Sequence, residues 1–190
     1  MVNLPVELHL LIFDLLPTYE LIKCRQICNL WNIIIDNNLH IFNIDVSNTN
    51  ITNNALKLFK NAKKINLTNC LKITNKGLDY LTNIENISLN GCFNISAKGL
   101  KKIKNVKILD VSWCNINSKD LLHLSNPDTV IVSLDIENKI LKKYPNTHFI
   151  YDTHYLMQFD YSSQSEYSEY SDDTRSYSDN EPSFNIADEF

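Results

Sequence analysis

Apolar positions in the middle of the chain recur with a period of 21 or 22 residues. Each unit has the frame apolar-x-x-apolar-x-apolar-x-x-Cys/Thr, as in Ile84, Ile87, Leu89 and Cys92. The same frame is filled by Ile41, Ile44, Val46 and Thr49, by Ala62, Ile65, Leu67 and Cys70, and by Val106, Leu109, Val111 and Cys114. A repeat of this length predicts one short strand and one helical return per unit, stacked on copies of itself.

Each return is predicted from an apolar pair at helical spacing, for example Leu78 and Leu81. Gly77 and Gly99 lie where the helical segment should pack tightly under the turn. A fifth, degenerate unit uses Val130 and Val132, after which a helix should stop before Pro145 and "THFIY" should form a final strand. We therefore expect a short arc of about five units with parallel strands.

The first forty residues do not fit the repeat. Pro5 suits a first helical position, and an apolar stripe follows until Pro17 ends the helix. Thr18 is a plausible N-cap for a second helix, and Trp31 lies in a third. The predicted apolar positions of these helices are Leu8, Leu11, Ile12, Leu15, Leu16, Leu21, Cys24, Ile27, Cys28, Leu30, Ile34 and Ile35. Three short helices cannot bury this surface among themselves, so they either pack on the repeats or keep a surface for a partner.

The net charge of −4 hides a division of the chain. Residues 161–190 contain eight acidic residues and one Arg, whereas the first 160 residues carry a charge of about +3 (17 basic against 14 acidic). Neither value suggests a nucleic-acid partner, and without an apolar run near ~18 residues we expect no membrane span or secretion. The acidic tail is predicted to be disordered, with Ser163, Ser176 and Ser178 each three residues before an acidic one.

Cysteine is predicted to have a structural role. A small side chain with a weak donor at the end of each strand can bond backbone groups that face the interior. No Cys-x-x-Cys pair is present, so we expect no metal and no disulfide, and Cys24 and Cys28 are predicted core residues. We find no nucleotide loop and no metalloprotease or nucleophile motif, so we expect no catalytic residues and no cofactor.

Strand residues that alternate with the core positions should form an exposed face. The predicted binding residues there are Asp45, Asn66, Ser88, Asp110 and Ser112, together with Trp113. Trp113 either packs on the next loop or anchors a partner, because buried aromatic side chains often dominate binding energy. Lys101, Lys102, Lys104 and Lys107 form a basic edge that is either solvated or in contact with an acidic substrate or the chain's own tail.

Residues 40–150 resemble the cysteine-containing class of leucine-rich repeats, on "CLKITNKGLDYL" and "CFNISAKGLKKI". Residues 3–39 resemble an F-box, on "LPxEL", an Ile-x-x-Leu-Leu and "L…C…C…W", with mild departures at Ile27 and Asn29. This combination resembles the substrate receptor of a Skp–cullin–F-box ubiquitin ligase. The resemblance implies binding of the Skp adaptor by Leu4, Pro5, Leu8, Ile12, Leu15, Leu21, Ile27 and Trp31.

Through the adaptor, the resemblance further implies cullin and RING subunits, a protein substrate bound by the repeats, and catalysis by other subunits. The alternative is a non-catalytic scaffold that binds the Skp adaptor or another partner outside any cullin complex. The expected fold is α/β: a three-helix F-box (residues 1–39), a leucine-rich-repeat solenoid (residues 40–150) and the acidic tail (residues 151–190). The expected location is the cytoplasm, with the nucleus as an alternative.

Overall fold

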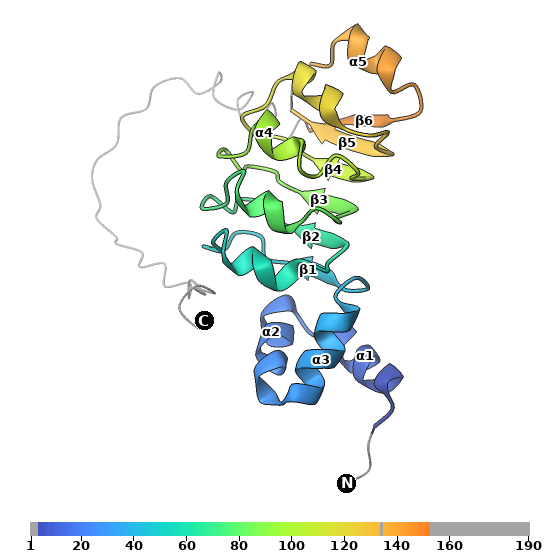
Figure 1. Cartoon of the computed structure of the whole chain (residues 1–190). Helices are drawn as coiled ribbons and strands as arrows, with labels where there is room; N and C mark the ends of the chain where they lie inside the picture. The colour runs from blue at the N-terminus through green and yellow to red at the C-terminus, as the bar shows by residue number, and fades with distance from the viewer. Residues whose placement is uncertain (1–3, 134, 153–190) are drawn as a thin grey trace, which may run out of the picture.

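The first five strands begin 21 or 22 residues apart and lie side by side in one parallel sheet (Figure 1). The computed structural model describes residues 4–133 and 135–152. The strands are β1 (Asn43–Asp45), β2 (Lys64–Asn66), β3 (Asn86–Ser88), β4 (Ile108–Asp110), β5 (Thr129–Val132) and β6 (His148–Tyr151), in that order across the sheet. The predicted α/β class with parallel strands is confirmed, and so is the final strand.

The remaining elements are helical. Three helices precede the sheet: α1 (Val6–Asp14), α2 (Thr18–Ile27) and α3 (Asn29–Asn38). The returns between strands are η1 (Ala55–Phe59), η2 (Gly77–Tyr80), α4 (Ala97–Leu100), η3 (Ser118–His123) and α5 (Asn138–Lys143). Three of these returns are 3₁₀ helices, and all five lie on one side of the sheet (Figure 1). None of the helices in the described ranges is long and apolar enough to cross a bilayer.

The strands pair in register, so equivalent positions of successive units stack. Ile44 pairs with Ile65, Ile65 with Ile87, Ile87 with Leu109 and Leu109 with Val130. All five side chains are buried, and one hydrophobic cluster extends from Phe13 to Tyr144. In β1–β5 the buried positions alternate with more exposed ones, as the sequence predicts, because successive side chains point to opposite faces.

Cysteine thiols join successive units. Cys70 Sγ donates to the carbonyl oxygen of Val46 at 3.1 Å, and Cys92 Sγ donates to that of Leu67 at 3.1 Å. Cys114 Sγ donates in the same way to the carbonyl of Leu89 at 3.0 Å. Each acceptor lies just past the strand of the preceding unit, so the thiols satisfy carbonyl groups that would otherwise be buried without a second partner. The predicted structural role of these cysteines is confirmed.

An asparagine in each of two returns explains the two return glycines. Asn53 Oδ1 accepts a hydrogen bond from the Thr74 backbone at 3.0 Å, and Asn75 Oδ1 accepts one from Ser96 at 3.0 Å. A Cβ at Gly77 would lie 2.6 Å from Asn53 Oδ1, and one at Gly99 would lie 2.5 Å from Asn75 Oδ1. The tight packing predicted for both glycines is therefore confirmed.

The helices α1–α3 and the first repeat are held together by polar contacts. Thr18 Oγ1 accepts from the backbone N–H of Asp45 at 2.8 Å. Arg25 donates to Asn32 Oδ1, to the Leu58 carbonyl and to Asp36 Oδ1, each at 3.1 Å. The N-cap role predicted for Thr18 is wrong, because Pro17 occupies that position and Thr18 is the first residue of α2. Its hydroxyl instead links α2 to β1.

Two other sequence predictions concern the ends of elements. α5 ends at Lys143, before Pro145 as predicted, and the buried Tyr144 hydroxyl donates to the carbonyls of Leu121 and Leu124 at 2.9 and 2.7 Å. Cys24 is buried as predicted, but Cys28 is exposed, because it lies in extended conformation at the break between α2 and α3. The acidic tail lies outside the described residues.

Burial raises the pKa of the Cys92 thiol to about 12. A thiol in the unfolded chain has a pKa of ~8.5. The buried, protonated Cys92 thiol therefore stabilises the fold fully below that pH, and this contribution is lost between about pH 8.5 and 12. We predict that the free energy of unfolding falls in this window more gradually in Cys92→Ser than in the wild type, because serine does not titrate there. Urea titrations at several pH values would measure both slopes. Parallel slopes would contradict this prediction.

Candidate functional site

The helices α1–α3 expose many large apolar side chains. Leu15 is 85% exposed and Ile27 is 65% exposed. The set, called here the helical apolar surface, contains Leu4, Val6, Leu8, Leu11, Ile12, Leu15, Tyr19, Ile27, Leu30 and Ile33. Leu8, Leu11, Ile12 and Leu15 lie at the i, i+3, i+4 and i+7 positions of one helical stripe. Exposed apolar surface of this size on one part of a chain is typical of a protein-binding site.

A small aromatic cluster supports this surface from within. The Phe13 and Trp31 rings meet edge to face at 5.3 Å between centroids, and His9 lies 6.1 Å from Phe13. Phe13 is buried, and His9 Nδ1 lies 3.1 Å from the Pro5 carbonyl oxygen. The cluster fixes α1 against α3 and so holds the exposed stripe of α1 outward.

The predicted adaptor-contact residues divide into two groups. Leu4, Pro5, Leu8, Ile12, Leu15 and Ile27 are exposed, and Trp31 is half-buried against Phe13. Leu21 is only 4% exposed, so its predicted contact with a partner is corrected. Leu21 belongs to the hydrophobic core that the helices share with the repeats. The sequence pattern could not separate Leu21 from Ile27, because both fit an apolar helical stripe.

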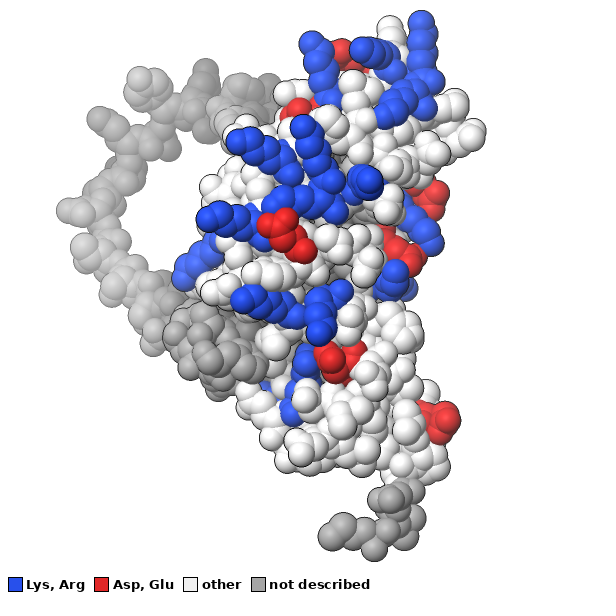
Figure 2. Space-filling model, viewed as in Figure 1, with Lys and Arg blue, Asp and Glu red and all other residues white. Residues whose placement is uncertain are grey.

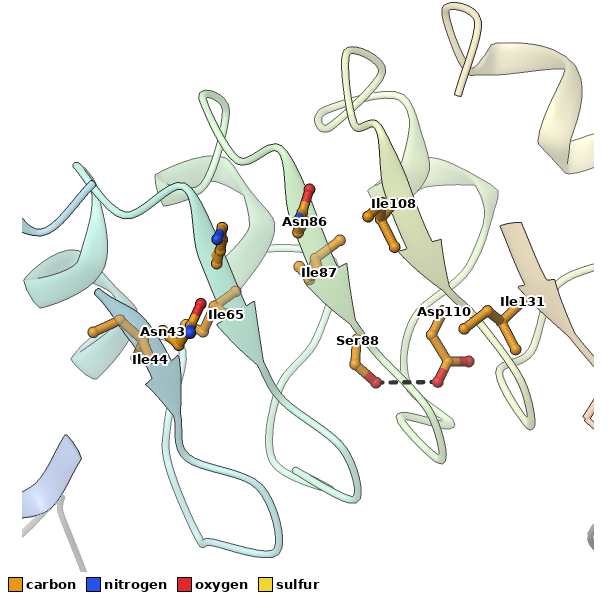
Figure 3. A pocket seen from close by; sticks show the side chains of 10 residues that line it. Asn43, Ile44, Ile65, Asn86, Ile87, Ser88, Ile108, Asp110 and Ile131 are labelled. Carbon is orange, nitrogen blue, oxygen red and sulfur yellow. Dashed lines mark hydrogen bonds between the residues drawn. The ribbon is translucent and has the colours of Figure 1, made fainter. Parts of the chain in front are cut away.

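A shallow groove of about 280 Å³ lies on the exposed face of the sheet (Figure 3). Its lining contains Asn43, Lys64, Asn86, Ser88, Ile108, Asp110 and Ile131, with Ile44, Ile65 and Ile87 beneath. Of the predicted binding residues, Ser88 and Asp110 line the groove. Asp45 and Asn66 lie in the same row of the sheet, in register with Ser88, but outside the groove.

Hydrogen bonds fix the polar part of this face. Ser88 Oγ lies 2.9 Å from Thr68 Oγ1 and donates to Asp110 Oδ2 at 3.2 Å (Figure 3). Asn90 Nδ2 lies 3.4 Å from the same Asp110 oxygen and 3.3 Å from Asp152 Oδ2. Asp110 Oδ1 accepts from the backbone of Ser112 at 3.0 Å. The Asp110 carboxylate is therefore already oriented before a ligand arrives.

Ser112 does not belong to the exposed face. Its side chain is 0% exposed, and its hydroxyl oxygen has no hydrogen-bond partner among the described residues. The substrate contact predicted for Ser112 is therefore corrected. It lies past the end of β4, where the chain turns and the alternation of the strand no longer applies.

Three isoleucines at the far end of the face were missed by the sequence argument. Ile108, Ile131 and Ile150 stand at exposed strand positions that are polar in most of the earlier units. Ile108 and Ile150 are each 40% exposed. The signal was present in "TVIV" of β5, where an apolar residue fills the outward position between two buried valines. The face thus changes from polar at β1–β3 to more apolar at β4–β6.

Trp113 packs toward the C-terminal end of the sheet. Its backbone N–H donates to Ser133 Oγ at 2.8 Å, and its Nε1 donates to Asp152 Oδ2 at 3.2 Å. It is half-buried and has a φ of 60°, the left-handed region that Asn48, Asn69 and Gly91 occupy at the equivalent positions. A large aromatic residue is unfavourable in this region. These contacts favour the packing interpretation of Trp113, although part of the side chain remains accessible.

The predicted basic edge is partly neutralised. Lys102 pairs with Asp79 at 2.5 Å, and Lys107 pairs with Glu85 at 2.7 Å. Glu85 also pairs with Lys63 at 3.0 Å, and the hydrogen bonds from Lys107 and Lys63 lower the pKa of its carboxyl. Lys101 and Lys104 are exposed. Within residues 4–133 and 135–152, no three His, Cys, Asp or Glu side chains form a group that could hold a metal ion.

We predict that Trp113→Asn is more stable than Trp113→Ala. Both variants lose the indole contacts and the bond to Asp152, but Asn tolerates the left-handed conformation, which otherwise costs about 1–3 kcal/mol. Urea unfolding of the two variants beside the wild type would measure the difference. If Trp113→Asn were the less stable variant, backbone strain would not contribute at this position.

Residues 1–44 match the family model described as F-box-like, which supports an F-box protein. The match covers α1, α2 and α3 and reaches into β1, so it contains the whole helical apolar surface. No curated protein matches the chain.

Proposed function

We propose that this chain is the substrate-recognition subunit of a Skp–cullin–F-box ubiquitin ligase. One observation carries the proposal: the helical apolar surface lies wholly within the residues that match an F-box-like domain. F-box proteins are generally non-catalytic and bind a Skp-type adaptor. Catalysis would belong to other subunits, and we propose a location in the cytoplasm, with the nucleus as an alternative.

The exposed side chains provide apolar contacts for an interface. Burial of one Leu or Ile side chain contributes about 1.5–3 kcal/mol, and Leu8, Ile12, Leu15 and Ile27 are all accessible. None of these four belongs to the described hydrophobic core. A partner can therefore cover them without any rearrangement of the helices.

The junction with the sheet supports a receptor role. Arg25 joins α2, α3 and η1 through three hydrogen bonds, and its ion pair with Asp36 is partly buried. The sheet therefore has a fixed orientation relative to the helical apolar surface. A ligase receptor acts by proximity, so a rigid junction would hold a bound substrate at a constant position relative to the adaptor.

We propose that residues 40–150 form a leucine-rich-repeat solenoid, that residues 1–39 form the F-box, and that the groove on the strand face binds a protein substrate. The groove combines an oriented carboxylate, Asp110, with apolar side chains at Ile108 and Ile131. Asp45 and Asn66 would extend the contact on the near side. A substrate with an apolar side chain beside a hydrogen-bond donor would fit this combination.

The second candidate is a scaffold that binds the Skp adaptor or another partner outside any cullin complex. The small extent of the groove favours this candidate, because about 280 Å³ accommodates only a few side chains. Purification of the tagged chain from cells, followed by detection of cullin, would separate the two. Recovery of the adaptor without cullin would favour the scaffold.

Loss of the adaptor is the expected result of Leu4→Ala combined with Pro5→Ala. Both residues are exposed, so the variant should fold normally while it loses apolar contacts of about 1 kcal/mol or more at each site. A pull-down with purified Skp adaptor would measure the affinity. The matched control is Leu71→Ala combined with Phe93→Ala, two exposed apolar residues of the repeats. Equal recovery by both variants would refute the adaptor surface.

Substrate selection is tested at the far end of the strand face. Asp110→Ala combined with Ile131→Asp should lower substrate ubiquitination by a reconstituted ligase about thirtyfold, because a lost hot-spot contact costs ~2 kcal/mol. Adaptor binding should be unchanged. The near-end pair Asp45→Ala and Ser47→Ala is the control and should have a smaller effect. A larger effect of the near-end pair would move the substrate site toward β1.

A further inference from the structure

Lysines gather on the side of the molecule that carries the helical returns (Figure 2). Lys76, Lys98 and Lys119 occupy equivalent positions in three successive returns, since they are separated by the repeat spacing of 22 and 21 residues. All three are exposed, and none forms an ion pair within the described part of the chain. We call these three residues the lysine column.

Among the described residues, the lysine column, like Lys101 and Lys104, lacks the ion pairs that Lys63, Lys102 and Lys107 form. Within the fold, Asp79 neutralises Lys102 and Glu85 neutralises Lys107. Lys76 instead borders a polar hollow of about 310 Å³ together with Lys72 and Asn54. Three like charges repeated along one face repel one another, and an anionic group bound across them would relieve this repulsion.

The chain itself supplies such a group. Residues 161–190 contain eight acidic residues and one Arg, against a charge of about +3 for the preceding 160 residues. Four of the acidic residues, Glu166, Glu169, Asp172 and Asp173, lie within eight positions. The two regions are therefore complementary in charge, and the covalent connection gives the acidic segment an effective concentration on the order of millimolar.

The connecting length is sufficient. The described chain ends at Asp152, next to the end of β6. Strand spacing of about 4.8 Å places β6 roughly 20 Å from β2, the strand that precedes Lys76. The 14 residues from Asp152 to Glu166 span up to about 45–50 Å when extended, enough to pass around the edge of the sheet.

We propose that residues 161–190 bind the lysine column of the same chain, with the acidic residues 166–173 in contact with Lys76, Lys98 and Lys119. This contact would cover the return side and leave the strand groove open, so it is independent of the proposed ligase role. Phosphorylation of Ser163, three residues before Glu166, would add about −1.5 to −2 charges and strengthen the contact.

The test is zero-length carbodiimide cross-linking of the full-length protein, followed by mass spectrometry. At 50 mM salt we expect cross-links from the lysine column to residues 166–173, and about fivefold fewer at 500 mM, because exposed charges are screened. Lys64 lies in the groove on the strand face and is the internal control. Cross-links at the level of Lys64, or cross-links insensitive to salt, would overturn the proposal.

Two variants identify the contact and its source. The triple variant Lys76→Gln, Lys98→Gln and Lys119→Gln loses the cross-links in any case, because it removes the reactive amines. The informative variant changes the acidic side: Glu166→Gln, Glu169→Gln, Asp172→Asn and Asp173→Asn should together abolish the cross-links of the lysine column. A charge-matched control replaces Asp188 and Glu189 with amides and should retain most of them. A 1:1 mixture of ¹⁵N-labelled and unlabelled protein separates the occupants. Mixed-isotope cross-links would show that a second copy supplies the acidic segment, which would refute binding within one chain.

Discussion

The structure depends on hydrogen bonds to the backbone carbonyl groups that turn inward at the end of each strand. A parallel stack with a fixed period buries one such carbonyl per unit beside the next unit. Leu67 shows the arrangement: its oxygen accepts from the Cys70 backbone at 3.0 Å and from the Cys92 thiol at 3.1 Å. The second donor comes from the neighbouring unit, so the bond that completes one turn also fixes the register of the next strand.

The same requirement limits the chemistry of the thiols. Burial raises the pKa of Cys92 and Cys114 to about 12, so both remain protonated and act as donors at neutral pH. In the first unit Thr49 fills the position, and its hydroxyl donates to the Val46 carbonyl at 2.7 Å. The Thr49 hydroxyl bonds a carbonyl of its own unit, whereas each thiol bonds a carbonyl of the preceding unit. In both cases a small side-chain donor satisfies a carbonyl just past the end of a strand.

The register of the stack assigns different properties to the two sides of the sheet. The outward strand residues are mostly polar at β1–β3 and become apolar at Ile108 and Ile131, and residues of both kinds line the groove. The return side carries the lysine column and the ion pair between Lys102, just after α4, and Asp79 of η2. Below both, Thr18 and Arg25 join the helices to the first unit, so the apolar surface and both sides of the sheet have fixed relative directions.

The sequence by itself determined the repeat, the strands and the buried row. A period of 21 or 22 residues with period-two alternation leaves one register in which Ile44, Ile65, Ile87, Leu109 and Val130 all point inward. It also predicted the cysteine bonds and the tight positions of Gly77 and Gly99, because both follow from stacking identical units. The match at residues 1–44 agrees with the F-box resemblance of the first helices.

Only the tertiary structure decided which members of a pattern are accessible. Leu21 and Ile27 share one predicted stripe of α2, yet Leu21 is buried in the hydrophobic core while Ile27, the last residue of the helix, is exposed. Ser112 and Cys28 stand where the strand or helix has ended, so periodicity no longer predicts their direction. Trp113 finds its partner in Asp152, 39 residues away. A periodic pattern is local, whereas accessibility depends on which distant segment is packed against each side chain.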